Sequence, residues 1–69
     1  MEVIKLRDEY IKLGQALKAA GFVENGVDAK FEINDGNVLV NGEVDTRRGR
    51  KLVHGDIVSY NGNTIKIVK

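Results

Sequence analysis

The dipeptide Asn-Gly occurs twice in this 69-residue chain, at Asn41-Gly42 and at Asn61-Gly62. Both of its residues accept a positive φ, which a two-residue type I′ turn requires at both central positions. β-branched and apolar residues precede each dipeptide, over residues 37–40 and 57–60, and follow the second over residues 64–68. The sequence therefore predicts two tight β-hairpins and a C-terminal half built of strands.

The N-terminal part predicts a strand followed by a helix. Residues 2–6 have the β-branched character of a short strand, which we expect to join the sheet. A helix capped by Asp8 or a neighbour is predicted to run to about Ala20, and Gly21 suits the position after its end. Its apolar stripe has 3-4-3 spacing and consists of Tyr10, Leu13, Leu17 and Ala20. The opposite face carries Lys12, Gln15 and Lys18.

A second helix is predicted between Asn25, a good N-cap residue, and the stop at Asp35-Gly36. Its apolar residues spread over two sides, so we expect contacts with more than one neighbour; they are Val27, Ala29, Phe31 and Ile33. The predicted architecture is a single α+β domain over residues 1–69, with two helices packed on a small, mostly antiparallel β-sheet. We expect most of the aromatic residues to lie in the core, with Phe31 left open between core and surface; they are Tyr10, Phe22, Phe31 and Tyr60.

The charge is distributed unevenly along the chain, although the formal net charge is only +1. Residues 1–45 contain five Lys or Arg against nine Asp or Glu, whereas residues 46–69 contain six against one. Four of the basic residues lie in Thr46-Arg47-Arg48-Gly49-Arg50-Lys51. Such a cluster either is a solvated loop or focuses positive potential toward a polyanion. We expect its arginines to be exposed and to contribute little to folding.

Several classes of function are disfavoured. The chain has no cysteine, no apolar run of membrane-spanning length and no signal-peptide pattern, so we expect a cytoplasmic protein without a membrane contact. His54 has no nucleophile or base beside it in the sequence, and there is no phosphate-binding loop or metal-ligand spacing. We therefore expect no enzymatic activity, no catalytic residue, no metal and no cofactor.

An ordered set of residues with constant gaps runs from Lys12 to Asp56. Its members in the helical half are Lys12, Leu13, Leu17, Gly21, Ala29, Lys30, Ile33 and Gly36. Its members in the β half are Val38-Leu39-Val40-Asn41-Gly42 and Gly55-Asp56-Ile57. The set resembles the RNA-binding domain named after ribosomal small-subunit protein S-four, also called the alpha-L motif, with a core of about residues 10–57. The resemblance implies that six apolar positions of the set are buried, namely Leu13, Leu17, Ala29, Ile33, Val38 and Val40. Within that family the chain looks most like the small stand-alone members of the YbcJ/YaaA type.

The resemblance implies RNA binding without chemistry, by a protein that we expect to be a monomer. The implied partner is structured RNA, either ribosomal RNA or tRNA, and a ribosomal particle is a further candidate partner. The residues implied to bind it are Lys12, Gln15, Lys18, Asn25, Gly26, Lys30, Arg47, Arg48, Arg50 and Lys51. The alternative is a protein-interaction adaptor of a ribosome-associated complex, whose basic loop contacts an acidic partner. Cations gathered on one face would favour RNA, and cations scattered around the domain would favour the adaptor.

The chain departs from the family pattern at three places. Gly14 stands where aspartate is frequent, Asn25-Gly26 replaces a frequent Ser-Arg pair, and Phe31 occupies a position that is often basic. Gly14 either loosens the first helix or allows a close approach by another segment. The other two changes remove cations from the second helix, and we expect the arginine cluster to compensate for them.

Overall fold

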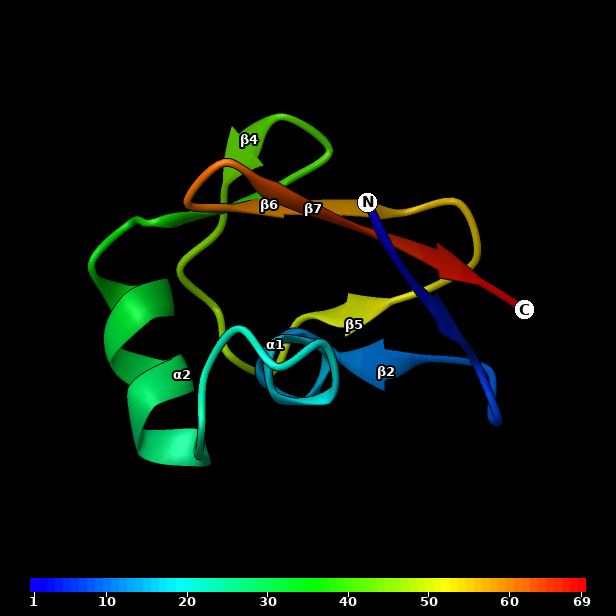
Figure 1. The fold of residues 1–69 in the computed structure, drawn as a ribbon, viewed down its shortest axis with the longest axis horizontal. Coiled ribbons are helices and arrows are strands. Elements are labelled where there is room, and N and C mark those ends of the chain that lie inside the picture. Colours follow the sequence, from blue (N-terminus) through cyan, green and yellow to red (C-terminus); the bar gives the residue numbers. More distant parts are fainter.

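The computed structural model describes residues 1–69 and has two layers (Figure 1). One layer is a five-stranded sheet, and the other holds two helices and a two-stranded sheet. The elements in chain order are β1 (Glu2–Lys5), β2 (Ile11–Lys12), α1 (Leu13–Ala19), α2 (Gly26–Asn34), β3 (Val38–Val40), β4 (Glu43–Val44), β5 (Lys51–Leu52), β6 (Ile57–Tyr60) and β7 (Asn63–Val68). The predicted α+β class is confirmed. Neither helix has the length and apolar character needed to cross a membrane.

Both predicted hairpins are present in the five-stranded sheet, whose strand order is β1-β7-β6-β3-β4. The first Asn-Gly turn joins β3 to β4, and the second joins β6 to β7. All four turn residues have a φ between 52° and 85°, as a type I′ turn requires. The local chemistry of these two dipeptides therefore fixes the register of half the sheet.

The N-terminal strand β1 joins the sheet beside β7, and the pair is parallel, with Val3 opposite Lys66. The pairing continues past the strand, where the Leu6 N–H donates to the Val68 carbonyl oxygen at 2.6 Å. Parallel neighbours need a long connection between them, and here that connection includes both helices and the other strands. The first and last strands thus close the domain side by side, while every other pair in the sheet is antiparallel.

Helix α1 begins later than the sequence predicts. Asp8 and Tyr10 lie outside it, and Ile11–Lys12 instead forms the strand β2, in which Ile11 is paired with Leu52 of β5. Tyr10, which was predicted to lie in the core, is 39% exposed. The prediction of a helix from Asp8 was therefore wrong at its start, because a pairing with a distant strand takes the place of the first helical turns. The end is as predicted, since Gly21 has a φ of 76° after the C-cap Ala20.

Helix α2 has the predicted boundaries but not the predicted contacts. The Asn25 side-chain oxygen accepts a hydrogen bond from the Asp28 N–H at 2.9 Å, which makes Asn25 the N-cap. Ala29 and Ile33 are fully buried, whereas Val27 and Phe31 are 62% and 63% exposed. The two-sided spread of apolar residues predicted contacts with more than one neighbour, but the side of Val27 and Phe31 is exposed, which places Phe31 at the surface. Helix α2 covers the core with one side and presents an apolar side to solvent.

The core lies between the helices and the sheet, and it contains six apolar positions of the family pattern. These positions are Leu13, Leu17, Ala29, Ile33, Val38 and Val40, and all are at most 2% exposed. Strands of the C-terminal half complete the cluster with Leu52, Val58, Ile65 and Ile67. Two distant parts of the pattern also meet directly, since the Asn41 side chain donates to Asp56 at 3.0 Å and accepts from the Ile57 N–H at 2.9 Å. Asn41 is therefore both a turn residue and a link between β3 and β6.

We expect Leu17→Ala to lower the free energy of unfolding by about 2–5 kcal/mol, because it leaves a cavity in a fully buried site. Such a loss is a large part of the stability of a domain of this size. Chemical denaturation followed by circular dichroism measures it. Val27→Ala, a truncation on the exposed side of α2, is the control and should change stability by no more than about 0.5 kcal/mol. Equal losses of unfolding free energy for the two variants would contradict the placement of Leu17 in the core and Val27 at the surface.

Candidate nucleic-acid interface

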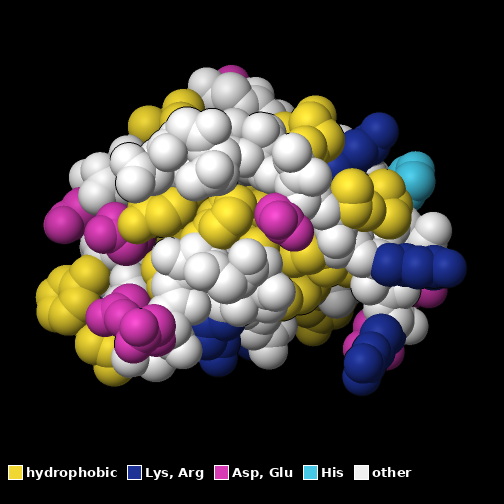
Figure 2. Space-filling view, viewed as in Figure 1, with side chains coloured by type: hydrophobic (Ala, Val, Ile, Leu, Met, Phe, Trp, Pro, Cys, Tyr) yellow, Lys and Arg dark blue, Asp and Glu magenta, His cyan; other side chains and the backbone are white.

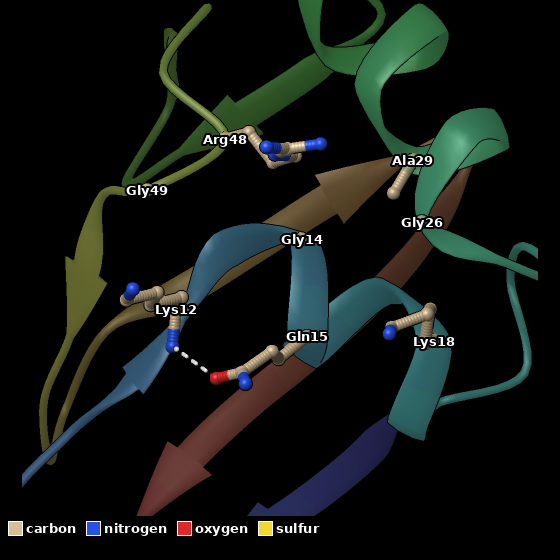
Figure 3. Close-up of a pocket in the computed structure, with 8 residues that line it drawn as sticks. All are labelled: Lys12, Gly14, Gln15, Lys18, Gly26, Ala29, Arg48 and Gly49. Atoms are coloured by element: carbon tan, nitrogen blue, oxygen red, sulfur yellow. Dashed lines mark hydrogen bonds between the residues drawn. The ribbon is translucent and has the colours of Figure 1, made fainter.

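A groove of about 280 Å³ lies where the first turns of both helices meet the loop between β4 and β5 (Figure 3). We call it the basic groove, and it is lined by Lys12, Gly14, Gln15, Lys18, Gly26, Ala29, Arg48 and Gly49. Three of these residues carry a positive charge and none carries a negative charge. The cations come from β2, α1 and the loop, so the fold gathers charges that are far apart in the sequence.

The basic loop, residues 46–51, lies against the beginning of α1 through backbone hydrogen bonds. The Leu13 N–H donates to the Arg50 carbonyl oxygen at 2.8 Å, and the Gly14 N–H donates to the Arg48 carbonyl oxygen at 3.1 Å. The first N–H groups of a helix have no partner within it, and the loop supplies the partners here. The loop therefore takes the place that a side-chain cap or a bound anion would occupy at α1.

Gly14 allows this close approach. A Cβ atom at this position would be only 2.7 Å from Cγ of Arg48, a distance that side chains do not tolerate. Of the two effects considered for a glycine here, the structure shows close packing. The Arg48 stem crosses the first turn of α1, and Figure 3 shows its guanidinium group between that turn and Ala29 of α2.

A buried carboxylate holds the basic loop from the other side. The Asp45 side chain is only 4% exposed, and its two oxygens accept hydrogen bonds from both flanking arginines. Arg47 donates through its backbone N–H at 2.9 Å, through Nε at 3.1 Å and through Nη2 at 2.8 Å. Arg50 donates through Nη1 at 2.7 Å. We expected loop arginines that contribute little to folding; these two instead neutralise a buried charge, so we now expect them to stabilise the fold.

These contacts fix the charge states in the loop. The hydrogen bond from the Arg47 side chain, with help from Arg50, holds the pKa of the Asp45 carboxyl well below its ordinary value, although burial acts in the opposite direction. The same hydrogen bond raises the pKa of Arg47. Asp45 is consequently ionised and Arg47 protonated throughout the neutral range. Arg47 still exposes 70% of its side chain and Arg50 exposes 30%, so Arg47 keeps the larger surface for another ligand.

The structure divides the ten residues expected to bind RNA into several groups. It brings five of them together in the basic groove, namely Lys12, Gln15, Lys18, Gly26 and Arg48. Lys30 is exposed one helical turn after Gly26, on the side of α2 that borders the groove. The remaining four have partners within the protein: Asn25 caps α2, Arg47 and Arg50 bind Asp45, and Lys51 lies 4.9 Å from the centroid of the Tyr10 ring.

Two kinds of site residue were not predicted from the sequence. Asp45 was not singled out, although arginines follow it at two and five positions, near enough in sequence to pair with it in a turn. Gly49 and Ala29 line the groove only because of how the chain folds. No group of three or more His, Cys, Asp or Glu side chains is placed to hold a metal ion. His54 lies away from the groove, where its Nδ1 accepts from the Lys69 N–H at 3.0 Å.

Comparisons with known proteins agree with this architecture. The solution structure of YbcJ from Escherichia coli, described as an alpha-L motif involved in RNA binding, superposes with a TM-score of 0.76. The aligned residues are 36% identical and cover 100% of this chain and 89% of that one. The two helices against a mostly antiparallel sheet are thus an alpha-L motif fold.

The family follows from the sequence matches. Residues 4–68 match the S4 domain. The chain is 48% identical over 59 residues to "Probable ribosome maturation protein RlbA" of Bacillus subtilis, covering 86% of this chain and 83% of that protein. It is 39% identical over 59 residues to YbcJ of Escherichia coli (strain K12), covering 86% and 84% respectively. The chain belongs to the S4 domain family.

We expect Asp45→Asn to lower the free energy of unfolding at neutral pH by about 1–3 kcal/mol, because it weakens charge-assisted hydrogen bonds to two arginines. The pH dependence should change as well. Since the folded-state pKa of Asp45 lies below its ordinary value of 3.8, the unfolded chain binds the proton first as the pH falls. The stabilisation by Asp45 is therefore complete above about pH 5 and is lost progressively as the pH falls below about 4.

Thermal unfolding between pH 2 and pH 7 tests this expectation. The midpoint should fall more steeply with decreasing pH in the unaltered protein than in Asp45→Asn. Glu43→Gln, two residues away on β4 and exposed, is the control and should follow the unaltered protein. A pH profile for Asp45→Asn that parallels that of the unaltered protein would contradict the role of this carboxylate.

Proposed function

We propose that this chain is a non-catalytic RNA-binding protein that recognises structured RNA through phosphate and shape contacts in the basic groove. The observation that carries the proposal is the gathering of Lys12, Lys18 and Arg48 around one groove without a carboxylate, in a chain of net charge +1. Positive charge placed in a hollow focuses potential more strongly than the same charge on a flat surface. The relationship to YbcJ, whose structure is described as an RNA-binding motif, supports this function.

The chemistry of the groove suits the backbone of folded RNA. An A-form helix presents phosphates and 2′-hydroxyls along a wide, shallow groove, which proteins recognise by shape more than by sequence. Lys12 and Lys18 supply ammonium groups, Arg48 supplies a planar fork for a phosphate, and Gln15 supplies an amide for a hydroxyl. The Gln15 oxygen accepts from the Lys12 N–H at 3.3 Å, so its NH₂ group is left for the ligand.

The N-terminus of α2 adds a second source of positive potential. Asn25 satisfies the Asp28 N–H, but the first N–H groups of the helix have no partner within it. Gly26 lines the groove and has no side chain, so a phosphate can approach its backbone closely. This geometry compensates in part for the Ser-Arg pair that the chain lacks at Asn25-Gly26. Lys30, one turn later, extends the cationic margin.

Ribosomal RNA is the RNA that we favour over tRNA. The name of the relative RlbA refers to ribosome maturation, and this relative is 48% identical to the chain. Ribosome maturation acts on folded ribosomal RNA, the kind of ligand that the groove suits. In this role the protein works as a monomer in the cytoplasm, binds without a cofactor and holds or shields an RNA fold without altering its covalent bonds.

The alternative of an adaptor whose basic loop contacts an acidic protein has less support. In that case we expected the cations to lie scattered around the domain. Three of them instead line one groove, and two of the loop arginines are engaged with Asp45. A groove with a helix N-terminus at its edge suits a phosphate better than it suits the carboxylates of a flat protein surface.

The salt dependence of binding tests the proposal. With about four phosphate contacts, the logarithm of the affinity for a tRNA transcript or a ribosomal RNA hairpin should fall with log salt at a slope of roughly −3 to −4. The double variant Lys12→Gln/Lys18→Gln should bind both RNAs more weakly and flatten the slope by about 2. Fluorescence anisotropy at several salt concentrations measures both quantities. These lysines are exposed and form no salt bridge within the chain, so the fold should not change.

The control is Lys66→Gln/Lys69→Gln, which removes the same charge from the C-terminal end of the chain, outside the groove. Lys69 pairs with Glu9, but both side chains are more than half exposed, so the loss of this pair should matter little. It should reduce the affinity much less, because it leaves the groove intact. Equal losses for the two double variants would mean that binding is diffuse charge attraction, and the groove would then not be the site. Arg47 and Arg50 are unsuited to this test, since their removal also releases Asp45.

A further inference from the structure

The exposed side of α2 carries an unusual combination of side chains for a small basic-groove protein. Val27 and Phe31, one turn apart, are more than three-fifths exposed. Beside them lies a hollow of about 270 Å³ between α2, the segment after α1 and β6. We call it the α2 hollow; the rings of Phe22, Phe31 and Tyr60 and the carboxylates of Glu24, Asp28 and Glu32 line it. In Figure 2, hydrophobic and acidic side chains lie together over the region of α2 at the lower left.

The α2 hollow and the basic groove have opposite charge, although they share a helix. Gly26 and Ala29 of α2 face the basic groove, whereas Asp28, Phe31 and Glu32 face the hollow. No lysine or arginine lines the hollow, and no aspartate or glutamate lines the groove. The phosphates of an RNA would be repelled by the three carboxylates, so the exposed ring of Phe31 does not serve as a base-stacking platform for the ligand of the groove.

The walls of the hollow are held in place. The rings of Phe22 and Tyr60 stack with their centroids 5.9 Å apart and their planes inclined by 27°. The Glu32 carboxylate accepts a hydrogen bond from the Asn37 side chain at 3.0 Å. The negative potential also acts on Tyr60, whose pKa is raised by burial first and then by Glu32 and Asp28. Aromatic faces and carboxylates arranged in this way attract an organic cation.

We propose that the α2 hollow binds a basic, amphipathic segment of a partner protein, with an arginine side chain in the hollow and an apolar side chain against Val27 and Phe31. Charge complementarity selects this occupant. A guanidinium group can stack on an aromatic ring and pair with a carboxylate at the same time. The apolar surface beside the hollow gives the neighbouring side chains of the segment a place to be buried. This inference does not depend on the RNA-binding function, since it concerns the other side of α2.

Fluorescence anisotropy with a labelled eight-residue peptide of alternating leucine and arginine pairs tests the proposal. We expect this peptide to bind and to perturb the amide resonances of residues 22–32 and 60 in a heteronuclear NMR spectrum. Peptides with glutamate for arginine, or alanine for leucine, should bind at least about tenfold more weakly. Phe31→Ala, and separately Glu24→Gln/Glu32→Gln, should weaken binding of the original peptide to a similar extent.

A matched control removes the same charge elsewhere. Glu2→Gln/Glu43→Gln alters two exposed carboxylates outside the hollow and should change the affinity by less than about threefold. Absence of binding, or equal losses for the two double variants, would overturn the proposal. So would a loss of affinity for a tRNA transcript in Phe31→Ala, because the ring would then belong to the RNA site. Detection of a dimer by analytical ultracentrifugation, together with its dissociation in Phe31→Ala, would also overturn the proposal. A second copy of this chain would then be the occupant of the hollow.

Discussion

The basic groove depends on one contact, the apposition of residues 48–50 to the first turn of α1. Four cations within six residues repel one another, and a free loop of this composition would extend into water. Two interactions oppose that tendency: the loop carbonyls accept the first N–H groups of α1, and Asp45 binds Arg47 and Arg50 from beneath. Removal of either interaction would leave buried polar groups unpaired, so the loop has a definite position and Arg48 a definite direction.

The parts of this fold that were predicted from sequence are those that a few neighbouring residues determine. The type I′ turns follow from Asn-Gly, because positive φ is a local property of those residues. The same holds for Asn25 as an N-cap and Gly21 as a helix terminator, which satisfy groups within one turn. The six core positions were also predicted correctly, since the family pattern had already recorded which apolar residues face inward.

The parts that were missed depend on segments far apart in the chain. Tyr10 fits a helical stripe, yet Ile11 pairs with Leu52, and no window around Tyr10 contains that information. Asp45 similarly lies in a sequence of polar residues, where only the three-dimensional structure shows that its carboxylate is covered. On α2, spacing alone distinguishes two apolar sides but does not indicate which side meets the core. The site residues therefore could be placed in one groove only once the loop and both helices had been positioned.

The separation of charge across α2 is the feature by which, under the proposed function, a nearly neutral chain binds a polyanion. A uniform distribution of eleven cations and ten carboxylates would give little potential at any distance beyond the Debye length. Here no carboxylate lines the groove and no cation lines the α2 hollow, so the two sides of a helix only about 10 Å thick carry opposite charge. Under the proposed function, this separation of charge orients the protein as it approaches RNA, with the groove inward and the acidic, aromatic side outward. An outward surface of this kind is accessible to basic proteins while the groove is occupied, so both sides can act at once.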